Sequence, residues 1–206
     1  MRKKNFLNKI LQNTGCPQGF WGRMILRGMN CFHASLAHRG MRQVEWQPEW
    51  TVLDTGCGGG ANLKRLLKLC PQGKIYGIDL SEESVAFAKK YNARYLDKRC
   101  FIRQGNVCSL PYEDGIFDAV TAFETVYFWS PIKMALSEVA RVCRKGGCFL
   151  ISLEVSDPEI GEMWTKRIAG MVVYTADDLK QLLFEAGFSS VKTIHKKEEL
   201  YIIAHK

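Results

Sequence analysis

The chain has 206 residues, 47% of them hydrophobic and 24% charged, which is typical of one globular domain with a substantial core. This composition excludes an intrinsically disordered chain and a small disulfide scaffold. The formal net charge is +8, and residues 1–50 alone hold 8 Lys/Arg against 2 Asp/Glu. The surplus charge therefore lies in the N-terminal quarter, where it suits a solvated surface, an anionic acceptor, anionic lipid or nucleic acid.

The first 49 residues show helical periodicity in GRMILRGMNCFHASLAHRGM and no strand pattern. We expect residues 1–49 to form helices packed across one end of a sheet. They would belong to a single domain, residues 1–206, whose core is formed by residues 50–206. Phe6, Leu7, Ile10 and Leu11 suit contact with either that core or a membrane surface.

From about residue 50, short apolar runs alternate with amphipathic stretches, which is the pattern of a parallel sheet with crossover helices. The expected helices are Ala61–Leu69, Ser81–Tyr95 and Pro131–Cys143, where proline suits the first helical turn. The expected strands are residues 51–54, 74–79, 100–105, 117–123 and 148–154.

A helix over residues 175–187 follows, with threonine at its start and glycine at its end. Two further strands are expected near residues 189–194 and 200–204. Their connection, HKKEE, is too short for a parallel crossover, so these two strands should pair antiparallel.

The eight cysteines contain no CxxC pair, and no histidine has the spacing of a zinc partner. We therefore expect reduced thiols and no metal site. The N-terminal sequence MRKKNFLNKILQN lacks the apolar stretch of a signal peptide, and no apolar run is long enough to span a bilayer. These features predict a cytoplasmic protein without a transmembrane segment.

The segment TVLDTGCGGGANL runs from an expected strand through four glycines into an expected helix. Such a loop turns backbone amides and a helix N-terminus toward the anionic end of a ligand. Asp79 ends the next strand, where a carboxylate suits the two hydroxyls of a ribose. Because Gly56, Gly58 and Ala61 also satisfy the dinucleotide-binding pattern, the loop alone leaves the nucleotide class open, and a tight turn without a ligand is the alternative.

Four segments together are more specific, and they are VLDTGCGGG, GIDLS, LPYEDGIFDAVTAFETVYFW and EVARVCRKGGCFLI. In this order and spacing, the chain resembles the class I S-adenosylmethionine-dependent methyltransferases, and more narrowly their type 11, small-molecule branch. The resemblance implies a doubly wound, Rossmann-like α/β fold with a seven-stranded, mostly parallel sheet, an antiparallel C-terminal hairpin and helices on both faces. It also implies S-adenosyl-L-methionine as cofactor and S-adenosyl-L-homocysteine as product.

The resemblance further implies roles for single residues. Asp79 matches the ribose-binding acid, Leu80 the apolar residue that packs on adenine, and Asn106 with Val107 the position at the adenine edge. An acid often stands where Asn106 does, and a carboxamide also accepts from an exocyclic amine. Glu124 matches a position at the methionine end. The full cofactor-binding set is Asp54, Gly56, Cys57, Gly58, Gly60, Asp79, Leu80, Asn106, Val107 and Glu124.

Methyl transfer needs the acceptor to be positioned and sometimes deprotonated, so a general base is useful but not universal. The candidate bases are His33, Glu124 and Tyr127, although His33 also fits a partly buried histidine without chemistry. We expect residues 19–30, GFWGRMILRGMN, to form a lid and acceptor wall. The expected acceptor pocket consists of aromatic residues that also suit ordinary packing, namely Phe20, Trp21, Tyr127, Trp129, Trp164 and Tyr174.

The leading hypothesis is methyl transfer to a small molecule by in-line displacement. The first alternative, an RNA or ribosomal-component methyltransferase, would use the basic N-terminal segment. Against it, residues 123–126 read FETV and not the [DNS]PP[YFW] motif of enzymes that methylate exocyclic base amines. Further alternatives are a non-catalytic S-adenosylmethionine-binding protein and a nicotinamide-dependent enzyme. The acceptor and the oligomeric state are not encoded in these motifs.

Overall fold

The computed structural model of the chain describes residues 14–206, and for Phe20 and Trp21 only the backbone. The expectation for Phe6, Leu7, Ile10 and Leu11 lies outside the described residues. The helices are α2 Gly19–Phe32, α3 Ala34–Met41, α4 Ala61–Leu69, α5 Glu82–Tyr91, the 3₁₀ turn η1 Val126–Phe128, α6 Ile132–Val142, α7 Pro158–Thr165 and α8 Ala176–Glu185. The strands are β1 Val52–Thr55, β2 Ile75–Asp79, β3 Cys100–Gln104, β4 Phe117–Phe123, β5 Cys143–Leu153, β6 Ser190–Lys196 and β7 Glu199–His205.

The seven strands form one sheet in the order β3-β2-β1-β4-β5-β7-β6. Strands β1 to β5 pair in parallel, whereas β7 pairs antiparallel with both β5 and β6. The strand order runs from β1 outward to β3 on one side and from β4 outward on the other, so a topological switch point lies between β1 and β4. Open α/β sheets bind ligands at the carboxyl ends of the strands beside such a point. The expected sheet and its antiparallel hairpin are confirmed.

Helices cover both faces of this sheet, as expected. Leu63 and Leu66 of α4 and Ala88 of α5 belong to the apolar cluster on one face. Leu136 of α6 and Leu179 of α8 belong to the cluster on the other. Both faces of the central strands are therefore buried, which explains why β1 and β4 read as nearly continuous apolar runs.

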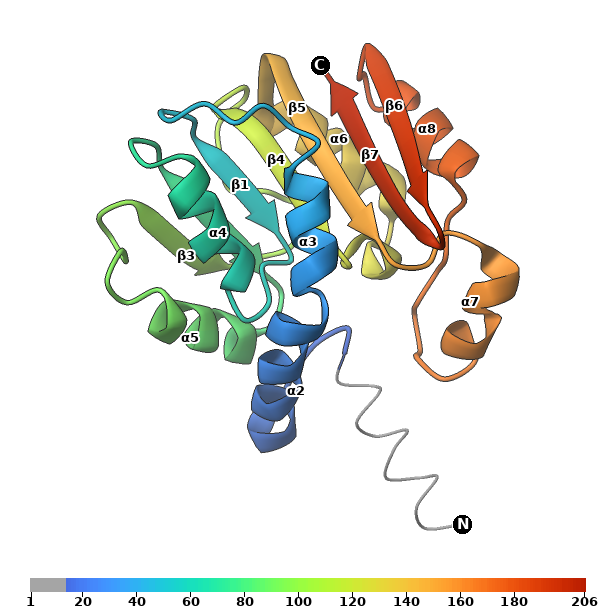
Figure 1. The fold of residues 1–206 in the computed structure, drawn as a ribbon, viewed down its shortest axis with the longest axis horizontal. Coiled ribbons are helices and arrows are strands. Elements are labelled where there is room, and N and C mark those ends of the chain that lie inside the picture. The colour runs from blue at the N-terminus through green and yellow to red at the C-terminus, as the bar shows by residue number, and fades with distance from the viewer. Residues whose placement is uncertain (1–13) are drawn as a thin grey trace.

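The N-terminal helices differ in their surroundings. Helix α3 packs against β5 and buries Leu36, Ala37 and Met41. Helix α2 continues past the sheet to the edge where the arrows of β1, β4 and β5 end, and α7 lies at the same edge (Figure 1). Within the described residues, no helix is long and apolar enough to cross a membrane.

Three expected boundaries are wrong. Helix α5 ends at Tyr91, because Asn92 caps it and its buried amide donates to the carbonyls of Gly60 and Ala88. Strand β5 begins at Cys143, because the polar segment after Cys143 remains extended across an irregular register beside Phe117. Pro131 is the N-cap of α6 and does not lie in its first turn.

All eight cysteines lie within the described residues, and none forms a disulfide. Five of them are buried, and burial raises the thiol pKa of Cys70, Cys100 and Cys148 to about 12. The eight cysteines are free thiols, as expected, and the raised pKa of the buried ones disfavours their thiolate forms.

Candidate cofactor and acceptor sites

The glycine loop after β1 needs its glycines for two different reasons. Gly56 has φ +70, and a Cβ there would overlap the Thr125 hydroxyl. Gly58 has φ +49, but a Cβ there would meet no atom closer than 4.0 Å. The first glycine therefore permits tight packing, whereas the second is required by its positive φ, since a Cβ there would only touch the Gly56 carbonyl oxygen and Leu26 at van der Waals distance.

Asp79 joins the loop to the end of β2. Its carboxylate accepts hydrogen bonds from the backbone amides of Gly58 at 2.8 Å and Ser81 at 2.9 Å. Burial raises the pKa of Asp79, and these two hydrogen bonds oppose the increase. Each carboxylate oxygen retains a second lone pair, so Asp79 can order the loop and accept from a ligand hydroxyl at the same time.

Two residues of the expected cofactor set lie beneath the loop. Asp54 is 1% exposed and accepts a hydrogen bond from the Thr121 hydroxyl at 2.7 Å. Burial raises the pKa of Asp54 to about 7. Gly60 approaches Ala88 and Asn92 of the neighbouring helix, where a Cβ would clash. Both positions support the loop from below and line none of the three cavities described next.

The Asp79 cavity, of about 140 Å³, lies at the carboxyl ends of β1, β2 and β4. Leu80 is 58% exposed at its rim, which is where an apolar side chain has room to pack on a flat ring. The Asn106 carboxamide oxygen accepts from the backbone amide of Cys108 at 2.9 Å. The lining residues that the sequence predicted for the cofactor are Gly56, Asp79, Leu80, Asn106 and Val107.

The loop cavity, of about 50 Å³, continues from the Asp79 cavity and shares Gly56 with it. Helix α2 contributes Met29 and Asn30 to its wall, His33 joins them from the junction between α2 and α3, and the loop contributes Cys57 and Gly58. Arg65 also lines it and donates to the side-chain oxygen of Asn62 at 2.8 Å. Sequence reasoning missed Arg65, although its place in the helix that opens at the loop was a usable signal.

The Trp164 cavity, of about 200 Å³, shares Met29, His33 and Glu124 with the loop cavity. It also shares Phe128 with the Asp79 cavity. The three cavities therefore follow one another along the carboxyl edge of the sheet. The walls of the Trp164 cavity are mostly apolar, and its full lining is Thr14, Met29, His33, Glu124, Tyr127, Phe128, Glu154, Val155, Trp164, Ile168 and Met171.

One end of the Trp164 cavity carries an ionisable cluster. His33 Nδ1 lies 3.3 Å from Glu154 Oε1 and 3.8 Å from Glu124 Oε2. Burial raises the pKa of Glu124 to about 7, although His33 and the Glu154 amide oppose this. The pKa of His33 is raised, because its contacts with the two carboxylates outweigh the opposing effect of burial. The expected bases His33 and Glu124 thus lie together, and Glu154 is an additional member that the sequence did not identify.

Tyr127, the third expected base, has its hydroxyl engaged. The hydroxyl donates to the Val155 carbonyl at 2.9 Å and accepts from the Val155 amide at 3.0 Å. Burial, together with the charge of Glu124, raises the pKa of Tyr127 far above its usual range. This environment favours a supporting role for Tyr127, which holds the segment after β5 against the cavity wall.

The expected aromatic pocket divides into separate groups. Trp164 joins Tyr127 in the Trp164 cavity, whereas Trp129 is buried, lines the Asp79 cavity and stacks on Phe149. Tyr174 lines none of the three cavities and packs partly against the core. Phe20 and Trp21 lie in α2, and their side chains are outside the description. The roof combines α2 with Trp164, Ile168 and Met171, so the 155–174 segment contributes more than expected.

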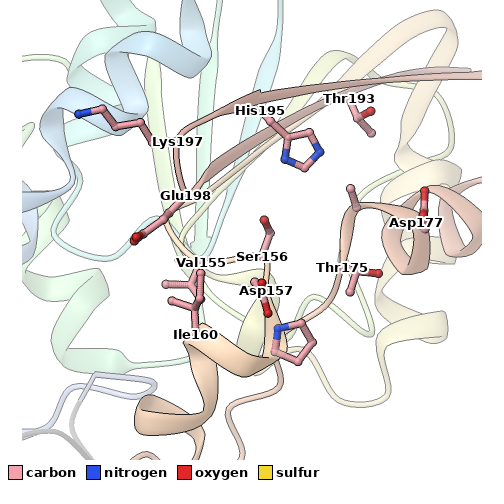
Figure 2. A pocket seen from close by; sticks show the side chains of 12 residues that line it. Val155, Ser156, Asp157, Ile160, Thr175, Asp177, Thr193, His195, Lys197 and Glu198 are labelled. Atoms are coloured by element: carbon pink, nitrogen blue, oxygen red, sulfur yellow. The ribbon is translucent and has the colours of Figure 1, made fainter.

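A separate hollow of about 530 Å³ lies between the starts of α7 and α8 and the β6–β7 hairpin. Figure 2 shows the His195 ring directed into it from β6, opposite Ser156 and Asp157. None of its lining residues belongs to the glycine loop or to the ends of β1, β2 and β4. It shares Val155 with the Trp164 cavity and so lies beside it, away from the glycine loop.

Comparison with known proteins agrees with this geometry. Residues 53–151 match the family model described as a methyltransferase domain. The demethylmenaquinone methyltransferase of Symbiobacterium thermophilum is 35% identical over 118 residues, which cover 56% of this chain and 47% of that protein. The fatty-acid O-methyltransferase of Mycolicibacterium smegmatis is 32% identical over 123 residues, which cover 59% of this chain and 43% of that protein. The chain thus spans about half the length of these curated relatives.

The solved structure of an S-adenosylmethionine-dependent methyltransferase from Aquifex aeolicus has a TM-score of 0.73 and 20% identity, covering 88% of this chain and 96% of that one. At this identity the likeness concerns the fold. Together with the family match and the relatives, it shows that this chain is similar in sequence to methyltransferases and in fold to an S-adenosylmethionine-dependent methyltransferase.

Proposed function

We propose that this chain is an S-adenosylmethionine-dependent methyltransferase that transfers a methyl group to a small molecule bound in the Trp164 cavity. The observation that carries the proposal is the continuity of the three cavities. They share Gly56 at one junction and Glu124 at the next, so a ligand that fills the first two ends where the third begins.

The residues present suit the cofactor. Asp79 and Leu80 offer a carboxylate for the ribose and an apolar surface for the adenine, and Asn106 with Val107 line the same cavity. Gly58 lines the loop cavity without a side chain, which lets a ligand approach the backbone of the loop. Arg65 offers a cation to the carboxylate of the methionine portion. When bound, S-adenosylmethionine supplies an electrophilic methyl group on sulfur.

The chain's own contribution is to orient the acceptor, exclude water and accept a proton. The apolar walls formed by Met29, Trp164 and Met171 keep water away from the acceptor. Glu124 lies where the loop and Trp164 cavities meet, so a proton leaving the acceptor has a nearby carboxylate to receive it.

The size of the Trp164 cavity supports a small acceptor. A volume of about 200 Å³ has room for a compact molecule. The names of the relatives also describe small or lipid-like acceptors, which supports the same class. The proposal extends to no particular compound of either relative.

Transfer of radiolabelled methyl groups from S-adenosylmethionine tests this function. The full chain is incubated with separate small-molecule and RNA fractions of a cell extract. We expect labelled product in the small-molecule fraction, and Gly58→Val should abolish it because a branched side chain would fill the space above the loop. Label that appears in the RNA alone would contradict the proposal.

A further inference from the structure

The Trp164 cavity has an unusual balance of charge for a chain with net charge +8. Two carboxylates, Glu124 and Glu154, face it beside a single imidazole, and no Lys or Arg is among its described lining residues. The basic side chain of Arg23 in α2 pairs instead with Glu83, outside the cavity. An anionic acceptor would meet two carboxylates here, and His33, the basic side chain among the described lining residues, is already paired with both of them.

The three ionisable groups are also close enough to act on one atom. One ligand atom from each of His33, Glu124 and Glu154 lies within 4.8 Å of the others. The Glu124 side chain is only 13% exposed, and its Oε1 already accepts from the Glu154 amide at 2.5 Å. Its other oxygen, Oε2, is the one that faces His33 and therefore the cluster.

The remainder of the cavity suits an apolar body with a cationic end. Rings of Tyr127, Phe128 and Trp164 line it, and aromatic faces attract organic cations. A volume of about 200 Å³ corresponds to roughly six or seven groups of the size of a water molecule. A single ring with a short tether is of this size.

We propose that the acceptor is an apolar amine, whose ammonium group Glu124 and Glu154 bind and whose proton Glu124 accepts. This inference rests on the proposed function and names the acceptor class for the same site. His33 holds the two carboxylates together and balances part of their charge.

The chemistry of transfer favours nitrogen over oxygen at this position. The ammonium group loses one proton to the Glu124 carboxylate, which leaves a lone pair on nitrogen. That lone pair forms the new N–C bond while the C–S bond breaks, and the electron pair of the broken bond goes to sulfur. Positive charge therefore develops on nitrogen beside Glu154, where a carboxylate stabilises it. A phenolate acceptor would instead have to form beside two carboxylates, which is unfavourable.

Binding to the full chain loaded with S-adenosylhomocysteine tests the acceptor class without requiring turnover. The probes are phenethylamine, 2-phenylethanol and 3-phenylpropanoate, which share a ring and tether and differ in charge. We expect phenethylamine to bind most tightly and 3-phenylpropanoate most weakly. Glu154→Gln should weaken phenethylamine roughly tenfold and leave 2-phenylethanol unchanged. The matched control is Glu162→Gln, an exposed carboxylate of α7 that does not line the cavity and should change neither.

Four outcomes overturn the amine proposal. These are equal or tighter binding of 3-phenylpropanoate, an unchanged ratio of amine to alcohol affinity in Glu154→Gln, binding of none of the probes, and amine binding that EDTA abolishes and Mn²⁺ restores. The last result would mean that the cluster binds a metal ion instead. Amine binding without methyl transfer from S-adenosylmethionine would contradict the proposed function and leave the charge preference standing, so the two failures are distinguishable.

Discussion

The Asp79 carboxylate is expected both to order the glycine loop and to bind the cofactor, and one substitution tests the second role. Its carboxylate holds the Gly58 and Ser81 amides, and it faces the cavity proposed for the ribose. Asp79→Ala should weaken S-adenosylmethionine binding by at least about tenfold, since hydrogen bonds to a charged group contribute about 1.5–3 kcal/mol each. Titration calorimetry measures this, with Asp177→Ala on the exposed first turn of α8 as control. Unchanged affinity would remove Asp79 from the site.

Burial raises the pKa of Glu124 to about 7, so the stability of the fold should depend on pH. A carboxyl whose pKa is higher in the folded than in the unfolded chain destabilises the fold as pH rises from its unfolded to its folded pKa. The pKa of His33 is also raised, so His33 stabilises the fold at low pH and loses this effect as pH rises. Both groups act in the same direction, and Glu154 and Tyr127 are the other titratable groups facing them.

The cofactor-free chain should therefore melt at a lower temperature near pH 8 than near pH 6. The Glu124 effect over this interval is about 1 kcal/mol, or about 2–4 °C for a chain of this size. Glu124→Gln should reduce the dependence and leave the part due to Asp54 and His33, whereas the exposed Glu162→Gln should retain all of it. Differential scanning calorimetry across this range measures both, and an identical slope in Glu124→Gln would refute the raised pKa.

The members of the ionisable cluster show what sequence could and could not reveal at this scale. Glu124 and the glycine loop were predictable because each lies at the end of an apolar strand within a recognisable motif. Glu154 also follows a strand, but its importance depends on His33, which reaches it from the junction between α2 and α3. That contact depends on how α2 packs on the sheet edge, and no local pattern encodes such a long-range arrangement.

At the scale of elements, boundaries were predictable where local signals decide them. Thr175 is the N-cap of α8 and forms a capping box with Asp178, and the sequence showed this threonine at the start of the expected helix. The end of α5 was not predictable, because the Asn92 side chain donates a hydrogen bond to the carbonyl of Gly60, which lies 32 residues earlier. Contacts between distant residues end that helix, while the apolar periodicity alone would extend it.

The packing of α3 on β5 gives a prediction with an internal control. A side chain at Gly40 would overlap the Ser152 hydroxyl and press on Tyr201, whereas Gly28 of α2 has only the Phe32 ring at 3.8 Å. Gly40→Val should lower the free energy of unfolding by about 1–3 kcal/mol through overpacking. Gly28→Val should change it little. Urea unfolding measures both, and equal effects would mean that α3 does not pack closely on the sheet.

At the scale of the whole molecule, the positive charge of residues 1–50 does not extend to the described lining of the Trp164 cavity. An anionic acceptor was one of the roles that the charge of residues 1–50 suits, but carboxylates and no Lys or Arg line the described part of the Trp164 cavity. The same quarter also divides structurally. Helix α2 supplies Met29 to the cavities and the α2–α3 junction supplies His33, whereas α3 contributes to the core. The lid expected at residues 19–30 therefore lies within α2 and does not include α3.

This division predicts that the segment after α2 unfolds together with the sheet. Leu36 of α3 is fully buried, so Leu36→Ala should lower the free energy of unfolding by about 2–5 kcal/mol. If α3 belongs to the core, calorimetry should show one transition that moves as a whole to lower temperature. Met24→Ala, on the exposed side of α2 with 51% of the residue accessible, should move it little. A small early transition that alone responds to Leu36→Ala would instead mean that residues 14–41 form an independently unfolding cover, and the lid would then include α3 as well as α2.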